Sequence, residues 1–168
     1  MDVWMALIIH TPDALGLVVD ERTRAMTTPN KIAFIKAQWH AGIVSQSLSG
    51  FNAEIGDAQV DAYDVPGAFE MPLLAKKLAE TGKYDAVVAA AFVVNGGIYH
   101  HEFVSTAVVD GLMKAQMDTG IPVFSVSLTP HNFQETPELI KFFTDHFVKK
   151  GAEAAKAVKA TLAVHAAL

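Results

Sequence analysis

The segment from Tyr84 to Val94 reads YDAVVAAAFVV and has no polar residue after Asp85. A strand with one face in water alternates apolar and polar side chains, and this segment does not. An unbroken apolar run is typical of a strand buried on both faces, as in a parallel sheet that is covered by helices. The segment therefore predicts an α/β fold.

A glycine pair, Gly96-Gly97, follows this run. Beyond it, apolar residues recur three or four positions apart from Val104 to Ala115, which predicts a helix that ends near Gly120. The two glycines allow a sharp bend and leave the first amides of the helix uncovered. Such a turn can bind an anion.

The rest of the chain alternates between strand-like and helix-like segments. Strands are predicted at 31–36, 59–65, 84–94 and 122–128. Helices are predicted at 43–55, from Pro66-Gly67 to Gly82, from 104 to about 120, and from about Gly151 onward, after apolar residues between 139 and 147. Short connections between these segments imply right-handed crossovers. We therefore expect a single-domain, three-layer, doubly wound α/β fold around a four-stranded parallel sheet.

The first thirty residues differ from the remainder. They begin with an apolar stretch that carries Asp2 where a secretory signal would carry basic residues, and residues 19–30 are polar without periodicity. With 168 residues, the chain has the length of one domain. We expect residues 1–30 to be a mobile N-terminal extension and residues 31–168 to form the domain.

Composition excludes several classes of protein. The net charge of -5 and the absence of a Lys/Arg cluster argue against binding to nucleic acid or to an anionic membrane. The chain has no cysteine, which fits a cytoplasmic location and excludes a thiolate nucleophile and a cysteine-bound metal. The seven histidines show no spacing typical of metal ligands, so no metal is expected.

Unusual residues follow each predicted strand. In open sheets of this type, ligands bind beyond the carboxyl ends of the strands. The segments at these ends are Gln38-Trp39-His40, Pro66 to Glu70, Asn95 to His101, and Thr129 to Phe133. Aromatic, acidic, glycine and imidazole groups would therefore share one rim.

Each of these residues also has an ordinary interpretation. Trp39 and Phe69 would cover the end of the sheet, and Glu70 would be a favourable charge near a helix start. His100 and His101 would be exposed residues at the start of a helix. A binding site is favoured because all of these residues converge on one rim.

The chain resembles 6,7-dimethyl-8-ribityllumazine synthase from about Lys31 to the C-terminus. The most specific matches are the segments Val65-Pro-Gly-Ala-Phe-Glu-Met-Pro72, Val93 to Val104, and Pro122 to Thr129, in the family's order and spacing. Gln38-Trp39-His40 and Gly96 to His101 are more similar to the type II branch. The resemblance implies a flavodoxin-like fold.

The family condenses 5-amino-6-(D-ribitylamino)uracil with 3,4-dihydroxy-2-butanone 4-phosphate in riboflavin biosynthesis, releasing phosphate and water. The resemblance therefore implies a transferase with two small-molecule substrates and no cofactor. It also implies a homo-oligomer with active sites between subunits: a pentamer, which in the type II branch is stacked as a decamer.

The resemblance assigns roles to individual residues. His100 matches the proton-transfer histidine, Trp39 would stack on the pyrimidine, and Lys150 matches a lysine at the substrate. The matched substrate-binding positions are Trp39, Gly67, Ala68, Phe69, Glu70, Val93, Val94, Asn95, Gly96, Gly97, Ile98, Tyr99, Ser125 and Lys150.

Some positions depart from the family pattern. Asn95 stands where an arginine is usual, Ile98 and Tyr99 replace two threonines, Ser125 replaces an aromatic residue of the neighbouring subunit, and Phe142 replaces the arginine that binds phosphate. These departures favour a weaker phosphate half of the site. Two alternatives therefore stay open: a weakly active paralogue that binds lumazine or flavin or serves as a scaffold, and a flavodoxin-like domain that binds phosphate.

Overall fold

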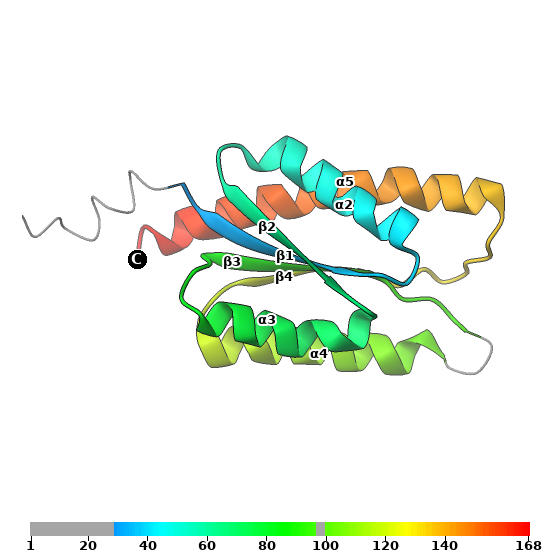
Figure 1. The fold of residues 1–168 in the computed structure, drawn as a ribbon, viewed down its shortest axis with the longest axis horizontal. Helices are drawn as coiled ribbons and strands as arrows, with labels where there is room; N and C mark the ends of the chain where they lie inside the picture. Colours follow the sequence, from blue (N-terminus) through cyan, green and yellow to red (C-terminus); the bar gives the residue numbers. More distant parts are fainter. Residues whose placement is uncertain (1–28, 97–99) are drawn as a thin grey trace, which may run out of the picture.

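The structure is a computed structural model that describes residues 29–96 and 100–168 (Figure 1). Its strands are β1 (Lys31–Ala37), β2 (Gln59–Val65), β3 (Ala86–Phe92) and β4 (Val123–Leu128). Its helices are α2 (Ala41–Ile55), the 3-10 helix η2 (Ala68–Glu70), α3 (Met71–Glu80), α4 (His101–Thr119) and α5 (Pro137–His165). The N-terminal extension expected at 1–30 lies outside the described residues except for its last two.

The four strands form one parallel sheet in the order β2-β1-β3-β4. Helices α2 and α5 cover one face, and α3 and α4 cover the other (Figure 1). The predicted three-layer, doubly wound architecture is confirmed. From β1 the chain crosses to β2 on one side of the sheet, and from β3 it crosses to β4 on the other. The carboxyl ends of β1 and β3 therefore flank the point where the winding direction reverses.

Strand β3 supplies both hydrophobic cores. All seven of its residues are buried, as its apolar run predicts. Val87, Ala89 and Ala91 pack against α3 and α4. Val88, Ala90 and Phe92 pack against α2 and α5. This alternation follows from the two-residue period of a strand, which sends successive side chains to opposite faces.

Two glycines allow α2 and α5 to touch through their backbones. A Cβ atom at Gly50 would lie 1.9 Å from the Val148 carbonyl oxygen, and one at Gly151 would lie 1.9 Å from the Ser47 carbonyl oxygen. Helix α5 runs without interruption through Gly151, so the prediction that the tail helix starts there is wrong. Gly151 marks a close contact between helices instead of a helix end.

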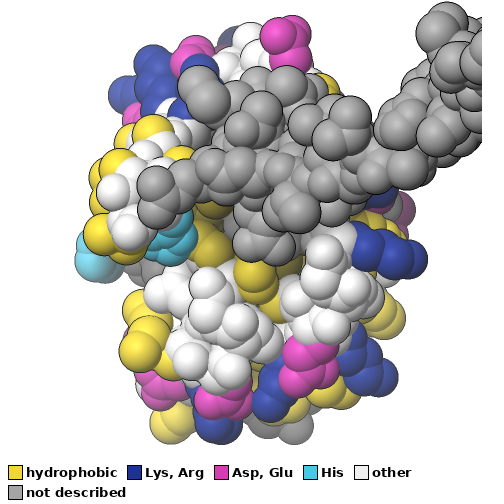
Figure 2. All heavy atoms as spheres, turned by 90° about the vertical axis from the view of Figure 1, so that its left-hand side faces the viewer, with side chains coloured by type: hydrophobic (Ala, Val, Ile, Leu, Met, Phe, Trp, Pro, Cys, Tyr) yellow, Lys and Arg dark blue, Asp and Glu magenta, His cyan; other side chains and the backbone are white. Residues whose placement is uncertain are grey.

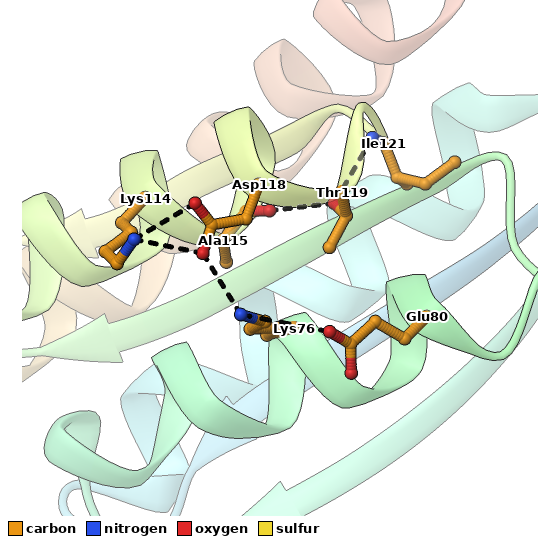
Figure 3. A network of polar contacts seen from close by, with 7 residues as sticks. All are labelled: Lys76, Glu80, Lys114, Ala115, Asp118, Thr119 and Ile121. Atoms are coloured by element: carbon orange, nitrogen blue, oxygen red, sulfur yellow. Dashed lines mark hydrogen bonds and ion pairs between the residues drawn. The ribbon is translucent and has the colours of Figure 1, made fainter.

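A surface ion network joins α3 to α4 (Figure 3). The Asp118 carboxylate lies 3.0 Å from the amino groups of both Lys114 and Lys76, and Lys76 also approaches Glu80 at 3.8 Å. Hydrogen bonds from Lys114 and Lys76 hold the pKa of the Asp118 carboxyl below its usual value. Because these groups reach solvent, the network contributes little stability and mainly fixes how the two helices lie.

The end of the molecule where the strands begin has a mixed surface. In the part of this end that the described residues form, basic and acidic side chains are interspersed with exposed apolar ones (Figure 2). Within residues 29–96 and 100–168, no helix combines the length and the apolar character that crossing a membrane requires.

The contact between α2 and α5 predicts the effect of a single methyl group. We expect Gly151→Ala to lower the free energy of unfolding by about 1–3 kcal/mol, because the helix backbones must move apart. Gly42→Ala, on the partner helix α2, is the control, since a Cβ there meets no atom within 4 Å. It should be neutral, or stabilising by up to about 1 kcal/mol. Denaturant unfolding at one fixed protein concentration measures both, and equal effects would contradict the close-contact interpretation.

Candidate active site at the carboxyl end of the sheet

The main candidate site is a cavity of about 820 Å³ beyond the carboxyl ends of β1 and β3. It lies where the winding direction of the sheet reverses, the place where open α/β sheets bind ligands. A second cavity of about 510 Å³ lies near the start of β4, and His165 is the one titratable residue that lines it within the described chain. The titratable and aromatic groups gather in the larger cavity.

Most of the predicted site residues line this cavity. Those brought together there are Trp39, Gly67, Ala68, Phe69, Glu70, Val93, Val94, Asn95, Gly96 and His100. Gly97, Ile98 and Tyr99 lie outside the described residues. Ser125 on β4 and Lys150 on α5 do not line the cavity of the single chain, and their roles stay predictions.

Trp39 provides a flat apolar surface at the mouth of the cavity. Its residue surface is 73% exposed, a high fraction for a side chain of this size. Position 67 has no side chain, and a Cβ there would lie 3.8 Å from the indole Cε2 atom. The Gly67 backbone therefore supports one part of the indole and leaves the rest accessible to a ligand ring.

Glu70 is fixed through one of its two carboxylate oxygens. Its Oε2 atom accepts a hydrogen bond of 2.9 Å from the Gly67 backbone N–H, which closes the turn between β2 and α3. This contact gives Glu70 a structural role at a helix start, as its ordinary interpretation requires. The residue remains exposed and lines the cavity, so its other oxygen is positioned to accept a hydrogen bond from a ligand.

His40 was predicted at the rim but given no role there, and it lines the cavity. Its φ angle of 55° places it in the left-handed region, and it stands just before α2. Its ring packs edge-on against Phe92 and Phe133, at centroid distances of 5.6 and 5.5 Å. Its Nδ1 atom lies 3.8 Å from Glu135 Oε1. His40 thus joins the start of α2 to the loop between β4 and α5.

Asn95 is bonded to the second histidine at the start of α4. Its Oδ1 atom lies 2.9 Å from the His101 backbone nitrogen and 2.9 Å from the His101 ring Nδ1. The side chain of His101 is only 14% exposed, whereas that of His100 is 75% exposed. The interpretation as an exposed helix-start residue therefore fits His100 and is wrong for His101.

The residues considered for phosphate binding lie on α5. Lys150 forms an ion pair of 2.6 Å with Glu153, and its hydrogen bond lowers the pKa of the Glu153 carboxyl. Phe142, at the position of the family's arginine, is 56% exposed and stacks on the His146 ring. Among the described residues, neither lysine nor arginine lines the cavity itself.

A metal site is not formed by the described part of the chain. Within it, no group of three His, Asp or Glu side chains is placed to hold a metal ion.

Four lining residues were predicted at the rim without a role of their own, because they follow strand ends: His40, Pro66, His101 and Phe133. The lining residues that were not assigned to the site are Ala37, Ala91, Phe92, Val104, Gln134 and Glu135. Gln134 and Glu135 belong to a loop without periodicity, and no sequence pattern distinguishes them from ordinary surface residues.

Comparison with known proteins gives one consistent result. The family model for 6,7-dimethyl-8-ribityllumazine synthase matches residues 29–166. A 6,7-dimethyl-8-ribityllumazine synthase from Rhodococcus erythropolis is 58% identical over 137 residues, which cover 79% of this chain and 88% of that protein.

Two further relatives are named 6,7-dimethyl-8-ribityllumazine synthase 2. The one from Pseudomonas syringae pv. tomato is 51% identical, with coverage of 83% of this chain and 86% of the relative. The one from Bradyrhizobium diazoefficiens is 46% identical, with coverage of 80% and 83%. The chain therefore belongs to the 6,7-dimethyl-8-ribityllumazine synthase family.

Proposed function

We propose that this transferase of riboflavin biosynthesis condenses its two substrates in the 820 Å³ cavity at the carboxyl end of the sheet. The substrates are 5-amino-6-(D-ribitylamino)uracil and 3,4-dihydroxy-2-butanone 4-phosphate. The carrying observation is that one cavity joins an exposed indole, two carboxylates and three imidazoles from four separate chain segments. The proposed reaction needs no cofactor and takes place in the cytoplasm.

The uracil half of the site is the better formed one. Trp39 stacks on the pyrimidine ring, and the backbone of Ala68, Phe69 and Val93-Val94 bonds the ring edge. Glu70 accepts hydrogen bonds from the ribityl chain through the oxygen that Gly67 does not occupy. Both substrates are intrinsically reactive, so most of the acceleration comes from holding them in a reactive orientation.

The phosphate half depends on the turn after β3 and on a neighbouring subunit. The segment from Gly96 to Tyr99, which precedes α4 in the chain, is the proposed phosphate-binding segment, as its motif position implies. Ser125 and Lys150 contribute from the subunit next to the cavity, and Lys150 exchanges Glu153 for the phosphate. His100 takes part in proton transfer, as its motif position implies.

Self-association follows from the apolar surface of the α3/α4 layer. Large exposed apolar side chains on these two helices are Leu73, Phe103, Val109, Met113 and Met117. This is more apolar surface than a monomer ordinarily leaves in water. We therefore propose a pentamer, stacked as a decamer, in which each site lies between two subunits.

Binding without turnover is the second candidate function. It is favoured by the composition of the cavity wall, which is rich in apolar groups and has no lysine or arginine among its described residues. Such a wall suits an uncharged lumazine or flavin ring better than a phosphate. Tight riboflavin binding without lumazine formation would favour this candidate.

The first functional prediction concerns activity without additives. Protein treated with a chelator should form lumazine from the two substrates faster than the spontaneous reaction, because the proposed chemistry uses only side chains and backbone amides. Lumazine absorbance measures the rate, and a boiled sample gives the background. A rate that stays at background at every protein concentration would exclude catalysis.

The second concerns the aromatic surface of Trp39. Trp39→Ala should raise the KM for the uracil substrate by about tenfold or more, because stacking on an aromatic side chain is worth about 1–3 kcal/mol per base. Trp39→Phe retains a stacking surface and is the matched control, with a KM near that of the unmodified protein. If the alanine variant keeps an unchanged KM, the ring binds elsewhere.

The third concerns assembly. Light scattering at micromolar concentration should give five or ten times the 18.1 kDa mass of one chain. Met113→Lys, which places a charge on the exposed apolar surface of α4, should reduce this mass. A monomer mass for the unmodified protein would rule out a site shared between subunits.

A further inference from the structure

The bond between Asn95 and His101 determines which way the Asn95 amide points. A backbone N–H can only donate, and the His101 N–H lies 2.9 Å from the Asn95 side-chain oxygen. The acceptor atom of the amide must therefore face His101. The same oxygen lies 2.9 Å from the His101 ring Nδ1.

The orientation of the amide in turn fixes the tautomer of His101. Two bare lone pairs at this distance would repel each other, so Nδ1 must carry a hydrogen and donate it to Asn95. In the neutral ring the lone pair then belongs to Nε2. A base with this lone pair stands in the cavity wall, with its ring held on one side and its side chain only 14% exposed.

Among the described residues, His100 has no comparable support. Its side chain is 75% exposed, its Nδ1 lies 3.9 Å from Glu102 Oε2, and its ring centroid lies 6.3 Å from that of Phe103. Neither of these two contacts selects one tautomer. Proton transfer requires the accepting nitrogen to be within reach of the proton, and a ring held by hydrogen bonds keeps that geometry better than an exposed one.

We infer that His101 is a second proton-transferring residue of this site and that Asn95 is the residue that positions it. The inference rests on the proposed function. In that reaction the carbon next to the imine loses a proton, the C–H electron pair forms a double bond, and phosphate leaves with the electrons of its C–O bond. The proton goes to His101 Nε2, which returns it to carbon when the resulting enol becomes a ketone, and the enol O–H proton passes to water as the C=O bond forms.

The asparagine at position 95, where an arginine is usual in the family, makes this contact with His101 possible. The arginine that is usual at this position has five donors and no acceptor, so it could not receive the His101 N–H groups. Asparagine supplies the acceptor. The same change that removes a positive charge from the phosphate half thus creates the support for the ring of His101.

The first experiment compares His101→Gln with His100→Gln in the assembled enzyme. Glutamine is polar but does not carry a proton at neutral pH. We expect His101→Gln to lower kcat by about tenfold to a hundredfold with little change in KM, and His100→Gln to lower it less. An unchanged kcat in His101→Gln would overturn the inference, while lumazine formation by the unmodified enzyme would leave the proposed function intact.

The second experiment moves the pKa of the proposed base. Asn95→Asp keeps an acceptor for both donors and adds a negative charge beside Nδ1, which favours the protonated ring and so raises its pKa relative to the unmodified protein. A base must be neutral to accept a proton, so the rise of kcat with pH should shift to higher pH. The shift should persist in the His100→Gln background and disappear in the His101→Gln background.

Other titratable groups line the same cavity, namely His40, Glu70, His100 and Glu135, and Glu102 Oε2 lies 3.6 Å from the His101 Nδ1 atom. These groups are present in both the His100→Gln and the His101→Gln backgrounds, apart from the replaced histidine itself. A shift in the pH dependence of kcat that disappears only in the His101→Gln background is therefore due to His101. A purely structural role for His101 would leave the pH profile unmoved by Asn95→Asp and would overturn the inference.

A third measurement does not depend on turnover. Nitrogen-15 NMR of the histidine-labelled protein, assigned by the signal that His101→Gln removes, reports which ring nitrogen carries hydrogen. We expect the Nδ1–H form above the pKa of the ring. An Nε2–H form would overturn the inference even if the enzyme were inactive.

Discussion

Burial of β3 on both faces is the constraint on which the rest of the molecule depends. Its small apolar side chains let helices pack on both faces of the sheet. The helical crossovers therefore lie on both faces, and strands are added on both sides of the β1/β3 pair. At the carboxyl ends of β1 and β3 the two crossovers diverge, and residues from four segments enclose the space between them. The cavity is therefore a consequence of topology, and the loops decide only what lines it.

The backbone contact of α2 with α5 extends this constraint to the site. Gly50 and Gly151 let the two helices approach until their backbones touch, which fixes the position of α2. The start of α2 carries His40, whose left-handed backbone and ring contacts with Phe92 and Phe133 hold the turn at Trp39. A stability defect at Gly151 would therefore also displace the aromatic surface proposed to bind the uracil ring.

The sequence predicted what depends on local pattern. The strands, their parallel pairing and the rim at Trp39, Glu70 and Asn95 all follow from apolar periodicity and turn residues. Helix α5 was predicted to start too late, because a glycine that permits a close helix contact resembles a glycine that ends a helix. The role of Glu135 was not predictable, because it depends on a loop that reaches across the sheet to His40.

The two adjacent histidines show where pattern and geometry give different information. The family motif assigns the proton-transfer role to His100, because a motif contains only residue types and their spacing from Gly96. At the start of a helix, successive side chains point about 100° apart, so one of two neighbours faces the protein while the other faces solvent. His101 is the less exposed of the two, and its ring is hydrogen-bonded to the Asn95 side chain. No sequence motif identifies this bond, because it joins two side chains six positions apart in the chain. Because asparagine offers an acceptor that arginine lacks, position 95 can hold the ring of His101 in this chain, and this contact is what supports the proposed role of that histidine.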